Sequence, residues 1–130
     1  MTTKIFLALS TLVWLPYGLY CLFRPESLAG AAGVAFHSAT GTTELRAMYG
    51  GLEAALGVLA GLALLRPSLV RPALVAIAFL TAGLATGRLI GVALDGSLSS
   101  YTATALAFEL SSALIALALL RRHSPLAAQT

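Results

Sequence analysis

The sequence predicts an all-α fold, a bundle of four helices embedded in a membrane, and three observations predict it. Apolar residues make up 58% of the 130 residues and charged residues only 10%, whereas an ordinary soluble domain carries about 25% charged residues. The mean hydropathy is +0.90. Four apolar segments recur along the chain, each about 20 residues long, and a helix of that length crosses a hydrocarbon core of about 30 Å.

The same composition excludes several classes of protein. Eight Lys and Arg and five Asp and Glu are too few to cover the surface of a small soluble domain. The basic residues are scattered, so no patch predicts binding to nucleic acid. The single cysteine, Cys21, excludes an internal disulfide and a cysteine-based zinc site, and we expect it to be a small buried apolar residue. We therefore expect one membrane domain over residues 1–130.

The first apolar segment is residues 5–23, and Arg24 followed by Pro25 ends it, because a residue before proline avoids the helical conformation. The connection over residues 24–43 is long for a helical bundle. Its apolar residues among Ala and Gly predict a short helix on the outer membrane surface. These apolar residues are Leu28, Val34 and Phe36.

The second segment is residues 45–65, and its start carries the residues that helix N-termini prefer. Thr42 or Thr43 can cap it, and Glu44 lies at the positive end of its dipole. The segment ends before Arg66, which is followed by proline and serine.

The third segment is residues 72–93, and an Asp-Gly-Ser turn over residues 95–97 separates it from the fourth, residues 101–120. Ser99 or Ser100 can cap the fourth helix. The backbone groups of these segments require helices, since open strands would leave polar groups unsatisfied in lipid.

Lys and Arg in the short loops predict the orientation. One side carries Arg24 in its loop, with two further arginines inside helix ends nearby. The other side, which includes both termini, carries more Lys and Arg, and we therefore expect it to be cytoplasmic. The basic residues on this side are Lys4, Arg66, Arg71, Arg121 and Arg122.

Glycines at spacing four predict close approach of helices in the membrane. Gly57 and Gly61 form one such pair in the second segment, and Gly83, Gly87 and Gly91 form a series in the third.

Three ionisable residues lie well inside the predicted spans: Glu53, Arg88 and Glu109. Glu53 and Glu109 each lie about 13 Å from the outer start of their segments, and Arg88 lies roughly 6 Å from the outer face. Three unpaired charges there would cost roughly 8 to 10 kcal/mol, so we expect them to face inward and to pair. One arginine against two glutamates leaves a surplus carboxylate, so we expect the two carboxyl groups to share one proton near neutral pH.

Further polar and aromatic residues accompany these three. Arg46 and Tyr49 share a helical stripe with Glu53, and Tyr49 is expected at the mouth of a polar pocket. An alternative is that Arg46 only extends its charge to the interface and that the tyrosines form an aromatic belt. The secondary candidates for the site are Glu44, Asp95, Tyr17 and Trp14.

The two histidines do not predict a metal site. His37 is expected in the outer loop and His123 in the cytoplasmic tail, on opposite sides of the membrane. We therefore expect no metal site and no cofactor. No nucleophile triad, phosphate loop or dinucleotide fingerprint is present in the sequence.

The run ELRAMYGGLE over residues 44–53, followed by Gly57, resembles the signature of a known family. The Gly-Arg pair at 87–88, the Asp-Gly pair at 95–96 and Glu109 fit the same signature. The chain is similar, over residues 11–120, to the domain of unknown function 4345 family. The resemblance implies a small bacterial four-helix membrane protein of the inner membrane, broadly similar to DoxX-like proteins, some of which are linked to quinone or sulfur redox chemistry. It implies no catalytic residue, because the function of the family is itself unknown.

The leading functional hypothesis is a multi-pass inner-membrane protein with a Glu/Arg pocket open to the outside. The pocket would bind a small amphiphilic or quinone-like ligand and exchange a proton with it, and whether catalysis follows is left open. One alternative is a structural or accessory subunit whose charges only fix helix packing. Another is a small proton-coupled exporter. The expected partners are the lipid bilayer, the ligand and a second copy of the chain.

Overall fold

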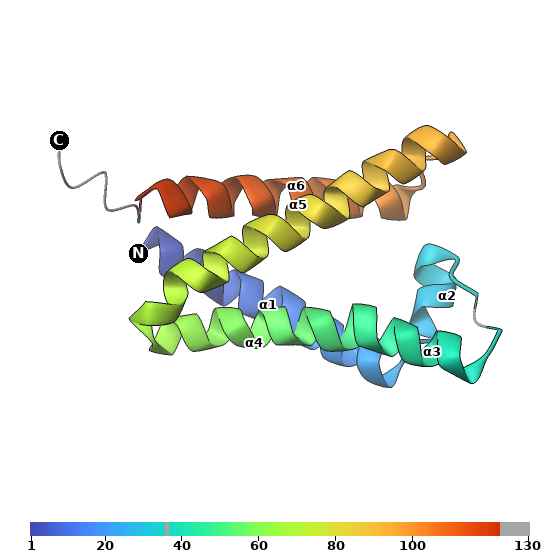
Figure 1. Ribbon diagram of the computed structural model, residues 1–130, viewed down its shortest axis with the longest axis horizontal. Helices are drawn as coiled ribbons and strands as arrows, with labels where there is room; N and C mark the ends of the chain where they lie inside the picture. The colour runs from blue at the N-terminus through green and yellow to red at the C-terminus, as the bar shows by residue number, and fades with distance from the viewer. Residues whose placement is uncertain (36, 123–130) are drawn as a thin grey trace. The chain divides into compact units, whose positions relative to one another are not determined.

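A computed structural model describes residues 1–35 and 37–122, and in this part of the chain all regular structure is helical and no strand occurs (Figure 1). The chain divides into two compact units, residues 1–70 and a second unit that begins at Arg71, and each is described by itself. The elements in chain order are α1 (Thr2–Phe23), α2 (Ser27–Ala32), α3 (Ala39–Leu45), η1 (Arg46–Gly51), α4 (Leu52–Leu65), η2 (Pro67–Leu69), α5 (Val70–Asp95) and α6 (Ser100–Arg122).

The four long helices cover the predicted segments and extend beyond them at one or both ends. The first helix begins at Thr2 and ends at Phe23, directly before Arg24 and Pro25, as predicted. Four helical stretches are long and apolar enough to cross a membrane. These stretches are Thr2–Phe23, Ala39–Leu65, Pro67–Asp95 and Ser100–Arg122.

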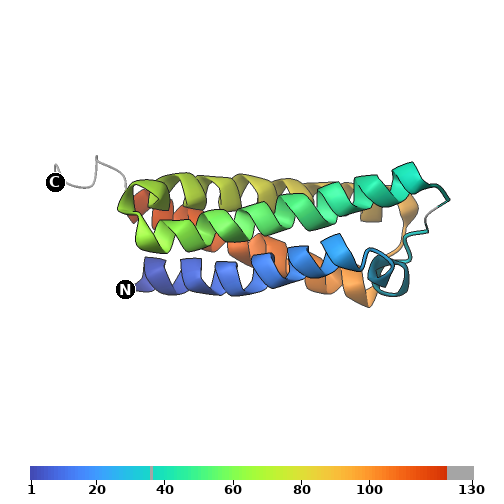
Figure 2. The ribbon, with the colours of Figure 1, turned by 90° about the horizontal axis from the view of Figure 1, so that it is seen from below.

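In the first unit, α1 packs along α4 and the adjoining turn η1 (Figure 2). Glycines make this approach possible. A Cβ atom added to Gly57 would lie 2.4 Å from the backbone nitrogen of Leu15, and one added to Gly18 would lie 2.3 Å from that of Ala54. Side chains larger than hydrogen therefore cannot occupy these positions without moving the helices apart.

A third contact continues the same antiparallel register, because a Cβ atom on Gly50 would lie 2.7 Å from the Cα atom of Leu22. Gly61 is the second glycine of the predicted pair with Gly57. A Cβ atom added to it would lie 3.3 Å from the Thr11 side chain, which is a looser contact. The prediction of close packing in the second segment is therefore confirmed at Gly57. The packing also uses Gly18 and Gly50.

The prediction for the glycine series of the third segment is wrong in the described part of the chain. A Cβ atom on Gly83 or Gly87 would meet no heavy atom within 4 Å, and one on Gly91 would only reach the Asp95 side chain at 4.0 Å. Spacing alone does not distinguish a packed glycine face from an open one.

A short helix, α2, occupies part of the connection between the first two long helices. It ends at Gly33, which takes the left-handed conformation at φ +68° that glycine adopts without strain. Leu28 is buried at 1% exposure, whereas Val34 is half-buried. Phe36, the third apolar residue of the predicted surface helix, lies outside the described residues.

The second long helix begins earlier than predicted. Its N-cap is Ser38, whose hydroxyl accepts a hydrogen bond from the Gly41 amide at 3.0 Å. Thr42 and Thr43 therefore do not cap the helix but lie inside it, and their hydroxyls donate to backbone carbonyls of the preceding turn. The prediction was wrong because it placed the cap next to the first large apolar residue, while the first turn of this helix contains only small residues and threonines.

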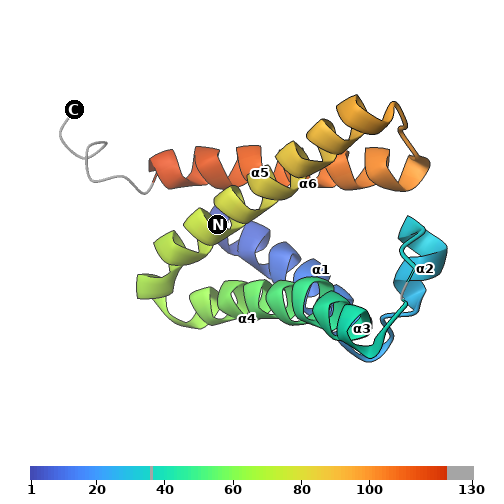
Figure 3. The ribbon, with the colours of Figure 1, turned by 45° about the vertical axis from the view of Figure 1, so that its right-hand side comes forward.

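α3 continues into α4 as one helix (Figure 3), and a π-helical turn, η1, lies between them. The amide of Leu52 donates to the carbonyl of Ala47, five residues back rather than four. Such turns often lie at functional sites. No feature of the sequence predicted it.

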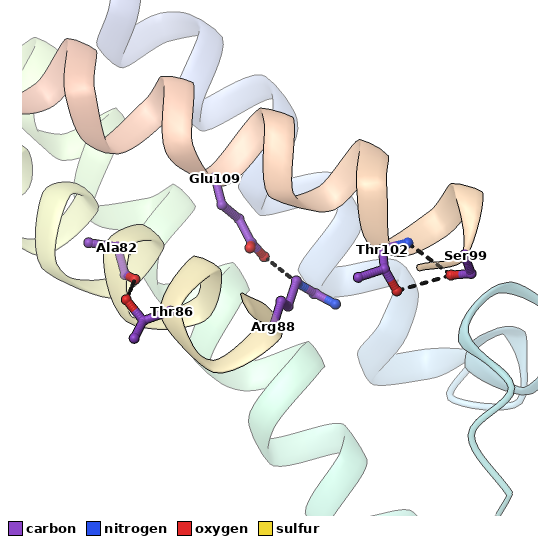
Figure 4. A network of polar contacts seen from close by, with 6 residues as sticks. All are labelled: Ala82, Thr86, Arg88, Ser99, Thr102 and Glu109. Atoms are coloured by element: carbon purple, nitrogen blue, oxygen red, sulfur yellow. Dashed lines mark hydrogen bonds and ion pairs between the residues drawn. The ribbon is translucent and has the colours of Figure 1, made fainter. Parts of the chain in front are cut away.

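The second unit contains α5 and α6. Gly96, at φ +62°, follows the end of α5, in agreement with the predicted turn. Of the two predicted caps for the last helix, Ser99 is the one used, since its hydroxyl accepts from the Thr102 amide at 3.1 Å (Figure 4). The buried residues of α6 lie on one stripe with helical spacing: Leu106, Glu109, Ser112, Ala113, Ala116 and Leu119.

Candidate functional site

An ion pair joins the two long helices of the second unit (Figure 4). The Nε atom of Arg88, on α5, donates a hydrogen bond to the Oε1 atom of Glu109, on α6, at 2.9 Å. The Glu109 side chain is 4% exposed and that of Arg88 is 22% exposed. The sequence predicted that Arg88 pairs with a carboxylate, and the structure confirms the pairing with Glu109.

The guanidinium of Arg88 also contacts an aromatic ring. Its Cζ atom lies 5.6 Å from the centre of the Tyr101 ring, within the range of a cation–π interaction. Tyr101 and Glu109 lie two turns apart on α6, with the small residue Ala105 between them on the same face. Two side chains of α6 therefore hold Arg88 in place.

The second carboxylate oxygen of Glu109 has a different environment. Oε2 is buried, and no donor among the described residues makes a hydrogen bond to it. Native proteins rarely leave a buried polar atom without a partner. This atom is therefore the clearest chemical feature of the second unit, and it belongs to a residue that the sequence singled out.

Glu53 lies in the first turn of α4, in the first unit, and is half-buried with a buried Oε2 atom. Cys21 of α1 interacts with the Tyr17 side chain and lies within electrostatic range of Glu53. The cysteine is fully buried, as predicted, and its spacing of four from Tyr17 places both residues on one stripe of α1. Its proximity to Glu53 was not predicted.

Arg46 was predicted from its spacing to line a polar pocket together with Glu53, and the structure does not bury it. It is exposed, and its Nε atom donates to the backbone carbonyl of Leu22 at 3.1 Å. The predicted stripe through Arg46, Tyr49 and Glu53 assumed 3.6 residues per turn throughout. The π-turn spans Arg46–Gly51, and its longer hydrogen bonds put the side chains before it out of phase with those after it.

The remaining candidates differ in their exposure to solvent. Tyr49 is half-buried within the π-turn, Trp14 is buried in α1 at 5% exposure, and Tyr17 is 37% exposed. Glu44 and Asp95 are exposed at or near helix ends. Within the described ranges no group of three or more His, Cys, Asp and Glu could hold a metal ion. His37 is exposed, and His123 lies outside these ranges.

An exposed ion pair between Arg24 and Glu26 follows α1 and was not predicted from the sequence. The pKa of the Glu26 carboxyl is below its ordinary value, first because the backbone amide of the same residue donates to it and second because Arg24 does. The Ser27 hydroxyl donates to the Arg24 carbonyl at 2.8 Å. The ion pair and this hydrogen bond lie at the start of α2.

These observations define a class of protein: an α-helical chain with four helices of membrane-crossing length and a partly buried Arg–Glu pair in its second half. The family model described as "Domain of unknown function (DUF4345)" matches residues 2–120, and the chain belongs to this family. The resemblance noted in the sequence is thereby confirmed. Comparisons with curated proteins and with solved structures find no match.

Proposed function

We propose that the chain is a multi-pass membrane protein that binds a small amphiphile, and that Arg88 and Glu109 bind the polar head group. The observation that supports this most is the buried Oε2 atom of Glu109, which receives no hydrogen bond from the described residues although the guanidinium of Arg88 binds the other oxygen. Ionisable groups inside membrane-spanning helices commonly mark ligand or proton pathways.

An arginine–carboxylate pair has the chemistry that such binding requires. The guanidinium provides only donors and the ionised carboxylate only acceptors, so together they can bind a carbonyl, an anionic oxygen or a hydroxyl. The carboxyl group can also exchange a proton with the ligand. A quinone-like head group and a simple oxygen-bearing amphiphile both fit this chemistry.

Binding is tested with the full chain in lipid nanodiscs, using decylubiquinone and 4-hexylphenol as probes. We expect saturable binding of at least one probe to the parent protein and at least tenfold weaker binding to Arg88→Gln. Ser111→Ala is the matched control, because its exposed hydroxyl on α6 bonds only the Phe108 carbonyl among the described groups. Absence of saturable binding of both probes would rule out the proposed function.

The second candidate, a structural or accessory role, is favoured by the same ion pair, because the pair joins α5 to α6. The stability comparison described in the Discussion separates the two. A transport function has no comparable support from a described contact.

We also propose that the protein lies in the inner membrane of a bacterium with both termini in the cytoplasm, since Lys and Arg concentrate on that side. Cysteines placed at Ser68 or Ser97, both exposed, test this in a Cys21→Ser background. A membrane-impermeant maleimide should label the Ser97 variant in cells with a permeabilised outer membrane and leave the Ser68 variant unlabelled. The reverse pattern would invert the topology.

A further inference from the structure

The two oxygens of the Glu109 carboxylate differ in what binds them. Oε1 accepts the hydrogen bond from Arg88 at 2.9 Å, whereas Oε2 is buried and receives no hydrogen bond from the described residues. An ionised carboxylate can only accept hydrogen bonds. The unfilled position on Oε2 therefore calls for a donor.

Glu109 lies on the buried face of α6. Ala105 precedes it by one turn and Ser112 follows it by nearly one turn, whereas Leu106, three residues before it, is a large side chain buried on the same stripe. Oε2 itself is closed to solvent. A ligand therefore reaches it by displacing neighbouring side chains, not by entering an open channel.

We infer that the head group taken by this site carries a hydroxyl, as in an amphiphilic alcohol or phenol, and that this hydroxyl donates its hydrogen to Oε2 of Glu109. The inference rests on the proposed function and narrows its ligand class. Aprotic head groups such as ethers leave Oε2 without a donor, and leaving a buried acceptor unpaired is unfavourable. The complex forms by hydrogen bonding alone, with no covalent bond made or broken.

The test compares 4-hexylphenol with its methyl ether, 4-hexylanisole, in which a methyl group replaces the hydroxyl hydrogen. Binding to the parent protein is measured by titration in nanodiscs of phosphatidylcholine. We expect the phenol to bind at least tenfold more tightly than the ether. This comparison needs no variant, so a folding defect cannot obscure it.

Glu109→Gln provides the second arm, because its amide supplies a donor where the carboxylate supplied an acceptor. We expect the preference for the phenol to fall below about twofold in this variant, and Ser111→Ala to keep the preference of the parent. An unchanged preference in folded Glu109→Gln would place the hydroxyl elsewhere and overturn the inference.

The outcomes separate this inference from the proposed function. Saturable binding of decylubiquinone together with equal binding of phenol and ether would preserve the proposed function and refute the hydroxyl class. Replacing phosphatidylcholine by phosphatidylglycerol distinguishes the source of the hydroxyl. If a lipid head group supplies it, phosphatidylglycerol should weaken phenol binding by competition, and if a free amphiphile supplies it, phenol affinity should be the same in both lipids.

Discussion

Gly57 of α4 and Leu15 of α1 bring their helix backbones into direct contact, with 2.4 Å between the position of an added Cβ atom and the Leu15 nitrogen. In lipid, helices associate through such close packing, because the lipid tails are as apolar as the side chains. The contact therefore defines where α1 and α4 can meet, and it belongs to a register shared with Gly18 and Gly50.

The change Gly57→Ala is expected to destabilise the first unit. The added methyl group would overlap backbone atoms that cannot rotate away, and overpacking of this kind costs about 1 to 3 kcal/mol. The free energy of unfolding is measured by titrating the protein in mixed micelles with a denaturing detergent. Gly83→Ala is the matched control, since a Cβ atom there has open space, and it should be neutral or slightly stabilising. Equal losses in the two variants would contradict the packing argument.

Removing one partner of the Arg88–Glu109 pair is expected to destabilise the protein more than removing both. Arg88→Leu leaves the nearly buried Glu109 carboxylate without its guanidinium, and breaking a buried pair costs about 3 to 5 kcal/mol. The double change to leucine at both positions removes the uncompensated charge and should regain most of that loss. The same detergent titration measures both variants.

This comparison also separates the two proposed roles. If the pair only fixes helix packing, the stable double variant keeps every phenotype of the parent protein. If the pair binds a ligand, the double variant folds but no longer binds 4-hexylphenol or decylubiquinone.

Ser99→Ala is expected to loosen the start of α6. The Ser99 hydroxyl satisfies the amide of Thr102 at 3.1 Å, and loss of an N-cap costs about 1 kcal/mol. Hydrogen exchange of the Thr102 amide should accelerate about fivefold, in line with that free energy. Ser100→Ala should leave the exchange rate near that of the parent, because Ser99 carries the cap. Faster exchange in both variants would indicate that the two hydroxyls share the role.

The Glu26 carboxyl is expected to titrate below its ordinary value of about 4.3, because its own amide and Arg24 bind the charged form. Since the folded-state pKa is depressed, the stabilisation is complete above the unfolded-state pKa. It is lost as the pH falls through the folded-state pKa. The chemical shift of the Glu26 carboxyl carbon follows this titration.

A variant at Arg24 separates the two causes. Arg24→Gln should raise the midpoint only part of the way to the ordinary value, because the backbone amide is the larger cause and remains. A midpoint that does not move in Arg24→Gln would show that the ion pair does not hold the charge.

The sequence was sufficient to predict the number and approximate limits of the long helices, because apolar segments of membrane-crossing length have few other solutions. The sequence was insufficient to identify the residues that cap the helices. Ser38 caps the second helix where Thr42 or Thr43 was expected, since a first turn of small residues and threonines has no apolar periodicity to mark it. Ser99 and Ser100 were equivalent by residue type, and only the three-dimensional arrangement distinguishes them.

For the candidate site, the sequence predicted that Arg88 pairs with an acidic residue, because an unpaired charge at that depth is costly. It did not predict that only one oxygen of Glu109 is bonded, because spacing carries no information on which atoms meet. Arg46 was grouped with Glu53 by a uniform helical period, and the π-turn changes that phase. Glycine spacing was correct at Gly57 and wrong at Gly83 for a related reason, since the pattern does not specify which face has a neighbour.

The π-turn at Arg46–Gly51 also has a consequence for comparing members of the family. A π-helical turn holds one residue more than the α-helical turn that it replaces. An insertion or deletion of a single residue can therefore be absorbed here without rotating α4 against α1. Relatives that differ in length by one residue should carry that difference in this stretch. An alignment that places the gap in a neighbouring loop will pair Arg46 with the wrong residue of the relative.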